Sequence, residues 1–289
     1  MMVWFPLSLA AAFLMATTAA YMKRFFSDVS PWEMAVIPFF YATPFCVAAF
    51  CFMEIPKLGP EFFPALSWVL PLTMVAIILH FRAIHMSPLS VTMPFLSFTP
   101  IFVILTGKLL LGETLSPYGI IGILLIVTGG YVLNLDSAKD GFTGPIRAIL
   151  REPGSALMLL VAALYGLCSV GGKILIINSS PMFAAMSLFG AYGLLLTTIL
   201  VGTGKASLRT ITSRPALGFG VGLCIFMEII CHNIAISLIA AAYMVAIKRL
   251  AGIFSVLYGW LLFQEHGIRY RLIGTLIMTA GAACIALWG

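Results

Sequence analysis

The sequence predicts an all-α integral membrane protein with ten transmembrane helices in two inverted five-helix repeats. Composition is the first observation behind this fold class. Of the 289 residues, 62% are hydrophobic and only 9% are charged, whereas soluble domains carry about 25% charged residues. So few charges cannot cover a water-exposed surface. We therefore expect a multi-pass protein in contact with the lipid bilayer, in a bacterial inner (plasma) membrane.

The second observation is a series of ten apolar runs, each bounded by charged residues, Pro or Gly. Each run is long enough to cross a hydrocarbon core of about 30 Å. The first run has no charged leader, so we predict a retained span and not a cleaved signal. The predicted spans are Val3–Phe25, Trp32–Met53, Pro64–Ile84, Pro88–Leu111, Pro117–Leu135, Ser155–Ile177, Pro181–Gly202, Pro215–Leu238, Ile239–Phe263 and Ile268–Trp288.

The third observation is an internal repeat. Residues 136–153 form the longest polar stretch and are predicted to connect two five-helix domains, residues 1–135 and 154–289. Six matched pairs are separated by 152 residues: His80/His232, Gly107/Gly259, Glu113/Glu265, Tyr118/Tyr270, Gly122/Gly274 and Gly129/Gly281. Near the start of each half the separation is 150 residues, in Lys23/Lys173 and Ser30-Pro31/Ser180-Pro181. An odd number of spans per repeat makes the second repeat cross the membrane in the opposite sense. The paired glycines are predicted to let helices pack closely.

Two adjacent cations, Lys248 and Arg249, stand in the middle of the predicted ninth span. At about 1.5 Å per residue, Lys248 lies roughly 13 Å from the start of that helix, near the membrane midplane. A cation at this depth costs several kcal/mol, so we expect the pair to face a cavity and to bind an anionic solute. The alternative is a different helix boundary, with both side chains extended to the membrane surface.

Glu228 lies just past the middle of the eighth span, where a carboxylate is a functional candidate by default. It is expected to act as counter-ion to Lys248 or Arg249, as ligand to a substrate ammonium group, or as a proton-coupling site. A purely structural ion pair is the alternative. His232 follows four residues later on the same helical face and can titrate near neutral pH.

Other polar residues and prolines of the spans complete the predicted site, each with packing or backbone hydrogen bonding as its structural alternative. The predicted substrate-binding residues are Lys248, Arg249, Glu228, Tyr243, Lys173, His232 and Asn233. The predicted gate or pathway residues are Lys23, His80, Pro94 and Pro100, the two prolines because they interrupt the fourth span.

Enzyme motifs are absent from the sequence: it contains no phosphate-binding Gly-Lys-Ser/Thr loop, no HExxH helix and no GxSxG elbow. We therefore predict no catalytic residues and no cofactor. The six cysteines all fall in apolar segments without metal-ligand spacing, so no metal site is predicted. The net charge of +6 does not form a basic stripe on a soluble face, which excludes a nucleic-acid partner.

The stretches SPLSVTMPFLSFTPIFVILTGKLLLGE and SLIAAAYMVAIKRLAGIFSVLYGWLLFQE each end in Gly-x5-Glu. With the repeat and the ten spans, they resemble the drug/metabolite transporter superfamily, specifically its EamA-like group. The resemblance implies a metabolite transporter with both termini in the cytosol. The sequence itself places eleven Lys and Arg residues in the odd-numbered loops, which by the positive-inside rule puts the termini outside.

The segment AIKRLAGIFSVLYG is similar to the ninth span of the triose-phosphate/phosphate translocators. In that subgroup a Lys-Arg pair clamps the substrate phosphate, and a late lysine of the sixth span also contacts it. The resemblance thus implies phosphate-binding roles for Lys248, Arg249 and Lys173, although the rest of the subgroup's pattern is missing here.

The leading expectation is a secondary transporter that moves a small anionic or zwitterionic metabolite, such as an amino acid, an organic acid or an organophosphate, by alternating access. A coupling proton or a counter-substrate is an expected further partner. The first alternative is an exporter of cationic or lipophilic compounds that uses Glu228 as its acidic site. A membrane-embedded enzyme is the second alternative, but no nucleophile or metal constellation supports it.

Overall fold

The computed structural model describes residues 3–86, 93–133, 153–263 and 268–289, and every regular element in these ranges is a helix. The helices are α1 Trp4–Phe25, α2 Pro31–Phe52, α3 Phe62–Met86, η1 Met93–Phe98, α5 Thr99–Leu111, α6 Pro117–Leu133, α8 Pro153–Ile177, α9 Pro181–Gly202, α10 Leu208–Ile211, α11 Pro215–Leu238, α12 Ala241–Lys248, α13 Ala251–Phe263 and α14 Ile268–Trp288. The predicted linker up to residue 152, and Glu265, lie outside the described residues.

Seven helical segments of the described residues are long and apolar enough to cross a membrane. Three further apolar helices are shorter: Phe95–Leu111, Pro117–Leu133 and Ile273–Trp288. The all-helical, multi-pass character predicted from composition is therefore confirmed. The number of ten spans stays a prediction, because the three shorter helices fall below the length of a full crossing.

The second helix of each predicted repeat begins in the same way. Ser30 accepts a hydrogen bond from the backbone N–H of Glu33 at 3.3 Å, and Ser180 accepts one from Phe183 at 3.2 Å. Glu33 returns a bond to the Ser30 N–H at 3.0 Å, which completes a capping box. In both cases the cap is followed by Pro, whose fixed φ suits the first helical turn.

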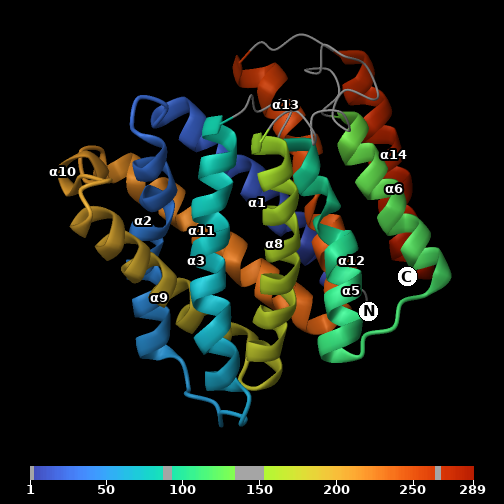
Figure 1. Ribbon diagram of the computed structural model, residues 1–289, viewed down its shortest axis with the longest axis horizontal. Helices are drawn as coiled ribbons and strands as arrows, with labels where there is room; N and C mark the ends of the chain where they lie inside the picture. Colours follow the sequence, from blue (N-terminus) through green and yellow to red (C-terminus); the bar gives the residue numbers. More distant parts are fainter. Residues whose placement is uncertain (1–2, 87–92, 134–152, 264–267) are drawn as a thin grey trace.

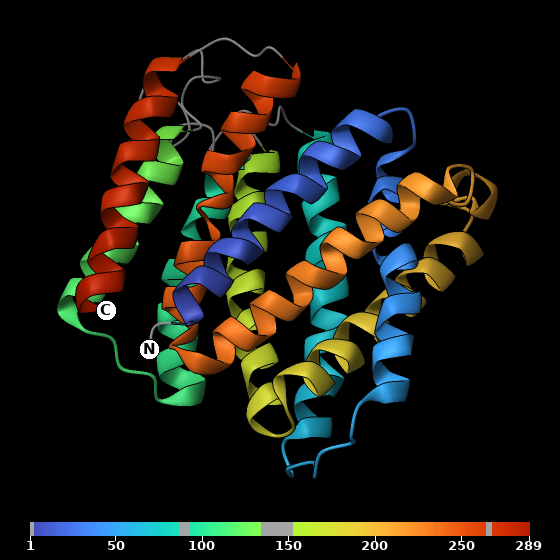
Figure 2. The same cartoon turned by 180° about the vertical axis from the view of Figure 1, so that it is seen from behind.

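The helices pack in a pattern that links the two halves. Helices α1 and α11 cross the molecule obliquely, side by side (Figure 2), and α3 packs against α8 (Figure 1). At one edge α2 packs against α9, with α10 beside them, and at the other edge α6 pairs with α14 (Figure 1). Most inter-helix contacts thus join one half of the chain to the other.

Two predicted spans are interrupted. The fourth consists of η1 followed by α5, which has Pro100 in its first turn; residues 88–92 of this prediction are not described. The ninth, predicted as one helix, is two: α12 ends at Lys248 and α13 begins at Ala251. Between them the N–H groups of Arg249 and Leu250 donate to carbonyls three residues back, at 3.0 and 2.9 Å. This tighter turn is the reason the continuous helix is wrong here.

An exposed ion pair holds the start of α11 against the end of α1. The Arg214 guanidinium donates to both carboxylate oxygens of Asp28, at 2.9 and 2.6 Å, and to the Phe25 carbonyl at 2.5 Å. These charge-assisted hydrogen bonds from Arg214 lower the pKa of Asp28 below its usual value. The pair is exposed, so it positions the helix ends but adds little stability.

Glycines hold α6 and α14 at close backbone distance. A Cβ on Gly122 would lie 2.8 Å from the Gly281 carbonyl oxygen, and one on Gly129 would lie 2.8 Å from that of Gly274. Contacts this short leave no room for a methyl group. The predicted packing role of these four glycines therefore agrees with the geometry, since lipid supplies no hydrophobic drive and close approach supplies van der Waals contact instead.

Gly129→Ala should force the two helices apart, because the obstacle is backbone that cannot rotate away. We expect a loss of about 1–3 kcal/mol of unfolding free energy, as for other overpacked sites, measured by denaturation of the purified protein in detergent. The matched control is Gly202→Ala, where an added Cβ meets nothing within 4 Å. Equal stability of the two variants would contradict the close-packed interface.

Candidate functional site

A cavity of about 330 Å³ lies between the two halves of the chain. Its walls come from α1, α2, α3 and η1 of the first half and from α8, α9, α11 and α12 of the second. Helices α6 and α14 contribute none of its described lining. The cavity is therefore formed where the halves meet, and neither half alone would enclose it.

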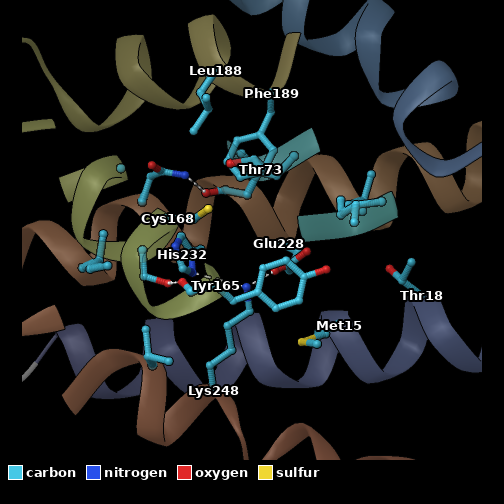
Figure 3. Close-up of a pocket in the computed structure, with 18 of the residues that line it drawn as sticks. Met15, Thr18, Thr73, Tyr165, Cys168, Leu188, Phe189, Glu228, His232 and Lys248 are labelled. Atoms are coloured by element: carbon cyan, nitrogen blue, oxygen red, sulfur yellow. Dashed lines mark hydrogen bonds and ion pairs between the residues drawn. The ribbon is translucent and has the colours of Figure 1, made fainter. Parts of the chain in front are cut away.

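A buried ion pair joins α11 and α12 in the cavity wall. The Lys248 Nζ lies 2.5 Å from Glu228 Oε1, and the two side chains are only 16% and 11% exposed. The same Nζ is 3.3 Å from Nδ1 of His232, which stands four residues after Glu228 on α11 (Figure 3). Because an ammonium group can only donate, a hydrogen bond between these two atoms requires His232 to accept through Nδ1 and to carry its ring proton on Nε2.

Arg249 lines the same cavity from the turn between α12 and α13. Its Nε is buried and has no hydrogen-bond partner in the described part of the protein. No described acidic side chain is within ion-pair distance of its guanidinium, whereas Lys248 is paired. A buried donor without a partner costs about 1–3 kcal/mol or more, so Arg249 is a cation of the cavity lining whose Nε is left unsatisfied by the described residues.

The remaining wall has a polar and an apolar part. His80 of α3 lies with its Nδ1 3.4 Å from the Tyr165 hydroxyl of α8. Leu188 and Phe189 of α9 lie on the side of the cavity opposite Lys248 (Figure 3). The charged groups are thus gathered at one side, and a bound molecule would meet hydrocarbon on the other.

Six of the residues selected from the sequence are brought together at this cavity. They are Lys248, Arg249, Glu228, His232, Asn233 and His80. The Asn233 side chain donates from Nδ2 to the Ile229 carbonyl at 2.8 Å, one turn back, which leaves its oxygen to accept. Their substrate-binding and pathway roles stay predictions.

Two predicted binding residues, Tyr243 and Lys173, are not among the described residues that line the cavity, and their binding roles stay predictions. The Tyr243 hydroxyl accepts from the Ser116 N–H at 2.9 Å and packs over Gly119 at the start of α6. Helix α12 turns this side chain away from the face that carries Lys248. Lys173 binds Glu113 instead, as described below. The described cavity lining therefore lacks Tyr243.

Lys23 and Pro100, two further predicted pathway residues, are also not among the described residues that line the cavity. Lys23 is exposed in the last turn of α1. Pro94 lies in η1, and Pro100 is buried in the first turn of α5. The two prolines thus mark where the fourth span changes its helical form, while Leu96 between them reaches the cavity.

Sequence reasoning missed several cavity residues of the first and sixth spans. Tyr165 and Cys168 are one turn apart on α8, and Thr18 of α1 has a buried Oγ1 without a hydrogen-bond partner in the described residues. Polar residues at helical spacing within an apolar span were the available signal.

Only Cys168 among the six cysteines lines the cavity, while Cys51 is exposed on α2. The described residues hold no cluster of three metal-ligating side chains.

The Gly-x5-Glu end of α5 has a structural explanation. Gly112 ends the helix in the left-handed conformation with φ +65°, and the Glu113 N–H then bonds back to the Gly107 carbonyl at 3.2 Å. The Glu113 side chain passes over Gly107, where a Cβ would lie 2.9 Å from its Oε2. Both glycines are needed to direct this carboxylate toward α12.

Glu113 ties three helices together. Its carboxylate accepts from the Ala241 N–H at 2.9 Å and so caps the N-terminus of α12. The Lys173 Nζ of α8 lies 2.5 Å from Glu113 Oε1 and donates to the Ile239 carbonyl at 2.6 Å. Both side chains are nearly buried, at 13% and 12% exposure. The helix that carries Lys248 is therefore fixed to α5 and α8 at its start.

Glu113→Ala should cost about 3 kcal/mol of stability, since removing one partner leaves a buried cation uncompensated. Lys173→Met in the Glu113→Ala background should recover part of this loss, and denaturation of the four proteins of this cycle measures the coupling. The control is Asp28→Ala in the exposed Asp28–Arg214 pair, for which a much smaller loss is expected. Additive effects of the two substitutions would contradict the coupling.

Comparisons with known proteins agree with this architecture. Residues 2–135 match the EamA-like transporter family. A solved structure titled "Crystal structure of protein" shares the fold with a TM-score of 0.79 at 16% identity, over 98% of this chain and 97% of that one. No curated protein sequence matches. The first half of the chain is thus similar to a family of membrane transporters of small molecules, and the whole chain has the fold of a protein of the same length.

Proposed function

We propose that this protein is a secondary transporter that moves a small anionic or zwitterionic metabolite by alternating access. One observation carries the proposal: the cavity between the halves gathers Lys248, Arg249 and Glu228, and none of the described residues pairs with the Arg249 Nε. The match of residues 2–135 to the EamA-like transporter family supports it. Location in a bacterial inner membrane stays a prediction.

The charge arrangement favours an anion over a cation. Glu228, the acidic site of the alternative exporter, is already neutralised by Lys248 at 2.5 Å. A cationic substrate would have to displace that ammonium and would then face two cations. An oxyanion can bind to Arg249 without breaking any interaction of the described residues, and the guanidinium fork suits two oxygens at once.

Alternating access is supported by a two-fold relation between the halves, which we infer from the α6–α14 glycines. Gly122 faces Gly281, and Gly129 faces Gly274. With an offset of 152 residues, Gly281 is the counterpart of Gly129, and Gly274 is the counterpart of Gly122. Such reciprocal contact is what a two-fold axis produces. Because the contact is antiparallel, this axis is perpendicular to the helices, as in inverted-repeat transporters.

The other helix pairs support the same relation. Helix α1 packs against α11 as α8 packs against α3, and α2 packs against α9. The α1–α11 and α8–α3 pairs each join the first helix of one repeat to the third helix of the other, and α2 and α9 are the second helices of the two repeats, residues 1–135 and 154–289. Rocking of one repeat against the other around the cavity would then open it to either side in turn.

Inverted repeats place corresponding loops on opposite sides of the membrane. We expect Lys57→Cys, in the link between α2 and α3, and Lys205→Cys, after α9, to react with a membrane-impermeant thiol reagent from opposite sides. The substitutions are made in a protein without its native cysteines and tested in oriented vesicles. Labelling of both from one side would exclude the inverted arrangement, and the labelled side also decides between the two predicted orientations of the termini.

Lys248→Ala and Arg249→Ala should each reduce binding of anionic ligands by about tenfold or more, since a hydrogen bond to a charged group contributes about 1.5–3 kcal/mol. Ligand-induced thermal stabilisation of the purified protein and uptake into proteoliposomes measure this. Lys108→Ala removes an exposed cation at the end of α5 and is the matched control. Normal binding and uptake by both cavity variants would refute the proposed function.

A further inference from the structure

The charges that line the cavity do not cancel. Among the described lining residues, Lys248 and Arg249 are cations and Glu228 is the one acid, which leaves a single positive charge. His232 adds none, because its Nδ1 accepts from the Lys248 ammonium and a doubly protonated imidazole could not accept. His80 is bonded to the Tyr165 hydroxyl, and an unperturbed imidazole is neutral at about pH 8.

The uncompensated charge belongs to Arg249. Lys248 already has an ionic partner at 2.5 Å and a second acceptor at 3.3 Å. Arg249 has neither among the described residues, and its buried Nε is unsatisfied. The edge of a guanidinium that carries Nε and one Nη binds a carboxylate through two parallel hydrogen bonds. A carboxylate bound there would accept a hydrogen bond from the unpaired Arg249 Nε. It would also neutralise the net positive charge of the cavity lining.

The lining across from Lys248 is mainly apolar: Leu188 and Phe189 lie there, with Thr73 beside them (Figure 3). Phe39, Ile77 and Ile225 are further apolar residues of the cavity lining. In Figure 3, Leu188 and Phe189 stand across the cavity from Lys248 and Glu228. A volume of about 330 Å³ is at the small end for ligand sites, which are about 300–1,000 Å³. The cavity therefore fits a compact molecule with one anionic end and a hydrocarbon body.

We propose that the substrate is an amphipathic monocarboxylate, with its carboxylate on Arg249 and an aromatic or branched apolar body against Phe39, Leu188 and Phe189. This rests on the proposed function and narrows it. A phosphate monoester would bring a second negative charge that no described group compensates, and an uncompensated charge in a low-dielectric site is expensive. A zwitterion would bring an ammonium group whose only acidic partner, Glu228, is already paired.

Four ligands on one hydrocarbon frame test the charge requirement: 3-phenylpropanoate, phenylalanine, 2-phenylethyl phosphate and 2-phenylethylamine. Binding to the purified full-length protein is measured by calorimetry at about pH 8, where free imidazole is neutral. We expect 3-phenylpropanoate to bind about tenfold tighter than each of the others, as one charged hydrogen bond can provide. Arg249→Gln should remove this binding, and Arg249→Lys should restore part of it.

Charge-altering variants give a readout that loss of folding cannot imitate. Glu228→Gln raises the cavity charge by one and should shift the preference to the phosphate ester. Adding Lys248→Met to Glu228→Gln lowers the charge again and should return the preference to the monocarboxylate.

In a protein whose only cysteine is Cys168, bound 3-phenylpropanoate should also slow thiol labelling, since Cys168 lines the cavity. Thermal denaturation confirms that each variant is folded.

The possible results separate this inference from the proposed function. Tightest binding of the phosphate ester or of phenylalanine by the wild type, still dependent on Arg249, overturns the monocarboxylate and leaves an anion or zwitterion transporter. Binding of 2-phenylethylamine alone, dependent on Glu228, overturns both. If none of the four ligands binds, the proposal that the substrate has an aromatic or branched apolar body is overturned. If Glu228→Gln leaves the ligand preference unchanged, the claim that the net charge of the cavity lining selects the ligand is overturned.

Discussion

The ion pair between Lys248 and Glu228 is the interaction on which the site depends. It lies between α11 and α12, where both side chains are only 16% and 11% exposed, and its 2.5 Å separation offsets part of the cost of burying the two charges. Lys248 is the last residue of α12, and the turn that follows brings Arg249 to the same cavity. Because Glu228 is paired with Lys248, Arg249 has no ion-pair partner among the described residues, and the proposed anion site rests on this observation.

A second buried ion pair holds this arrangement in place from outside the cavity. Glu113 caps α12 and binds Lys173, so the helix that ends in Lys248 is attached to α5 and α8 at its start. Lys173 stands at the position of the phosphate-binding lysine implied by the translocator resemblance, yet here it has a carboxylate partner and a carbonyl acceptor. Lys173 and Lys248 are therefore both held by a buried carboxylate, and only Lys248 lines the cavity among the described residues.

Helices α6 and α14 pack closely against each other and contribute no described residue to the cavity lining. Their glycines bring backbone against backbone, as Gly129 and Gly274 illustrate. This supplies van der Waals contact in a setting without hydrophobic drive. The cavity is lined by other helices, which come from both halves of the chain.

The sequence by itself determined the all-helical membrane class, the Ser-Pro starts of α2 and α9, and the packing role of the paired glycines, because lipid admits few structures and local caps depend on neighbouring residues. It also identified Lys248, Arg249 and Glu228 as candidate site residues, because a charged side chain inside an apolar span is energetically costly and is a functional candidate by default. Only the tertiary structure decided that Glu228 pairs with Lys248 and that Tyr243 and Lys173 face away. Those outcomes depend on how separate helices are rotated and joined at the turn after α12, which no local pattern of residues encodes.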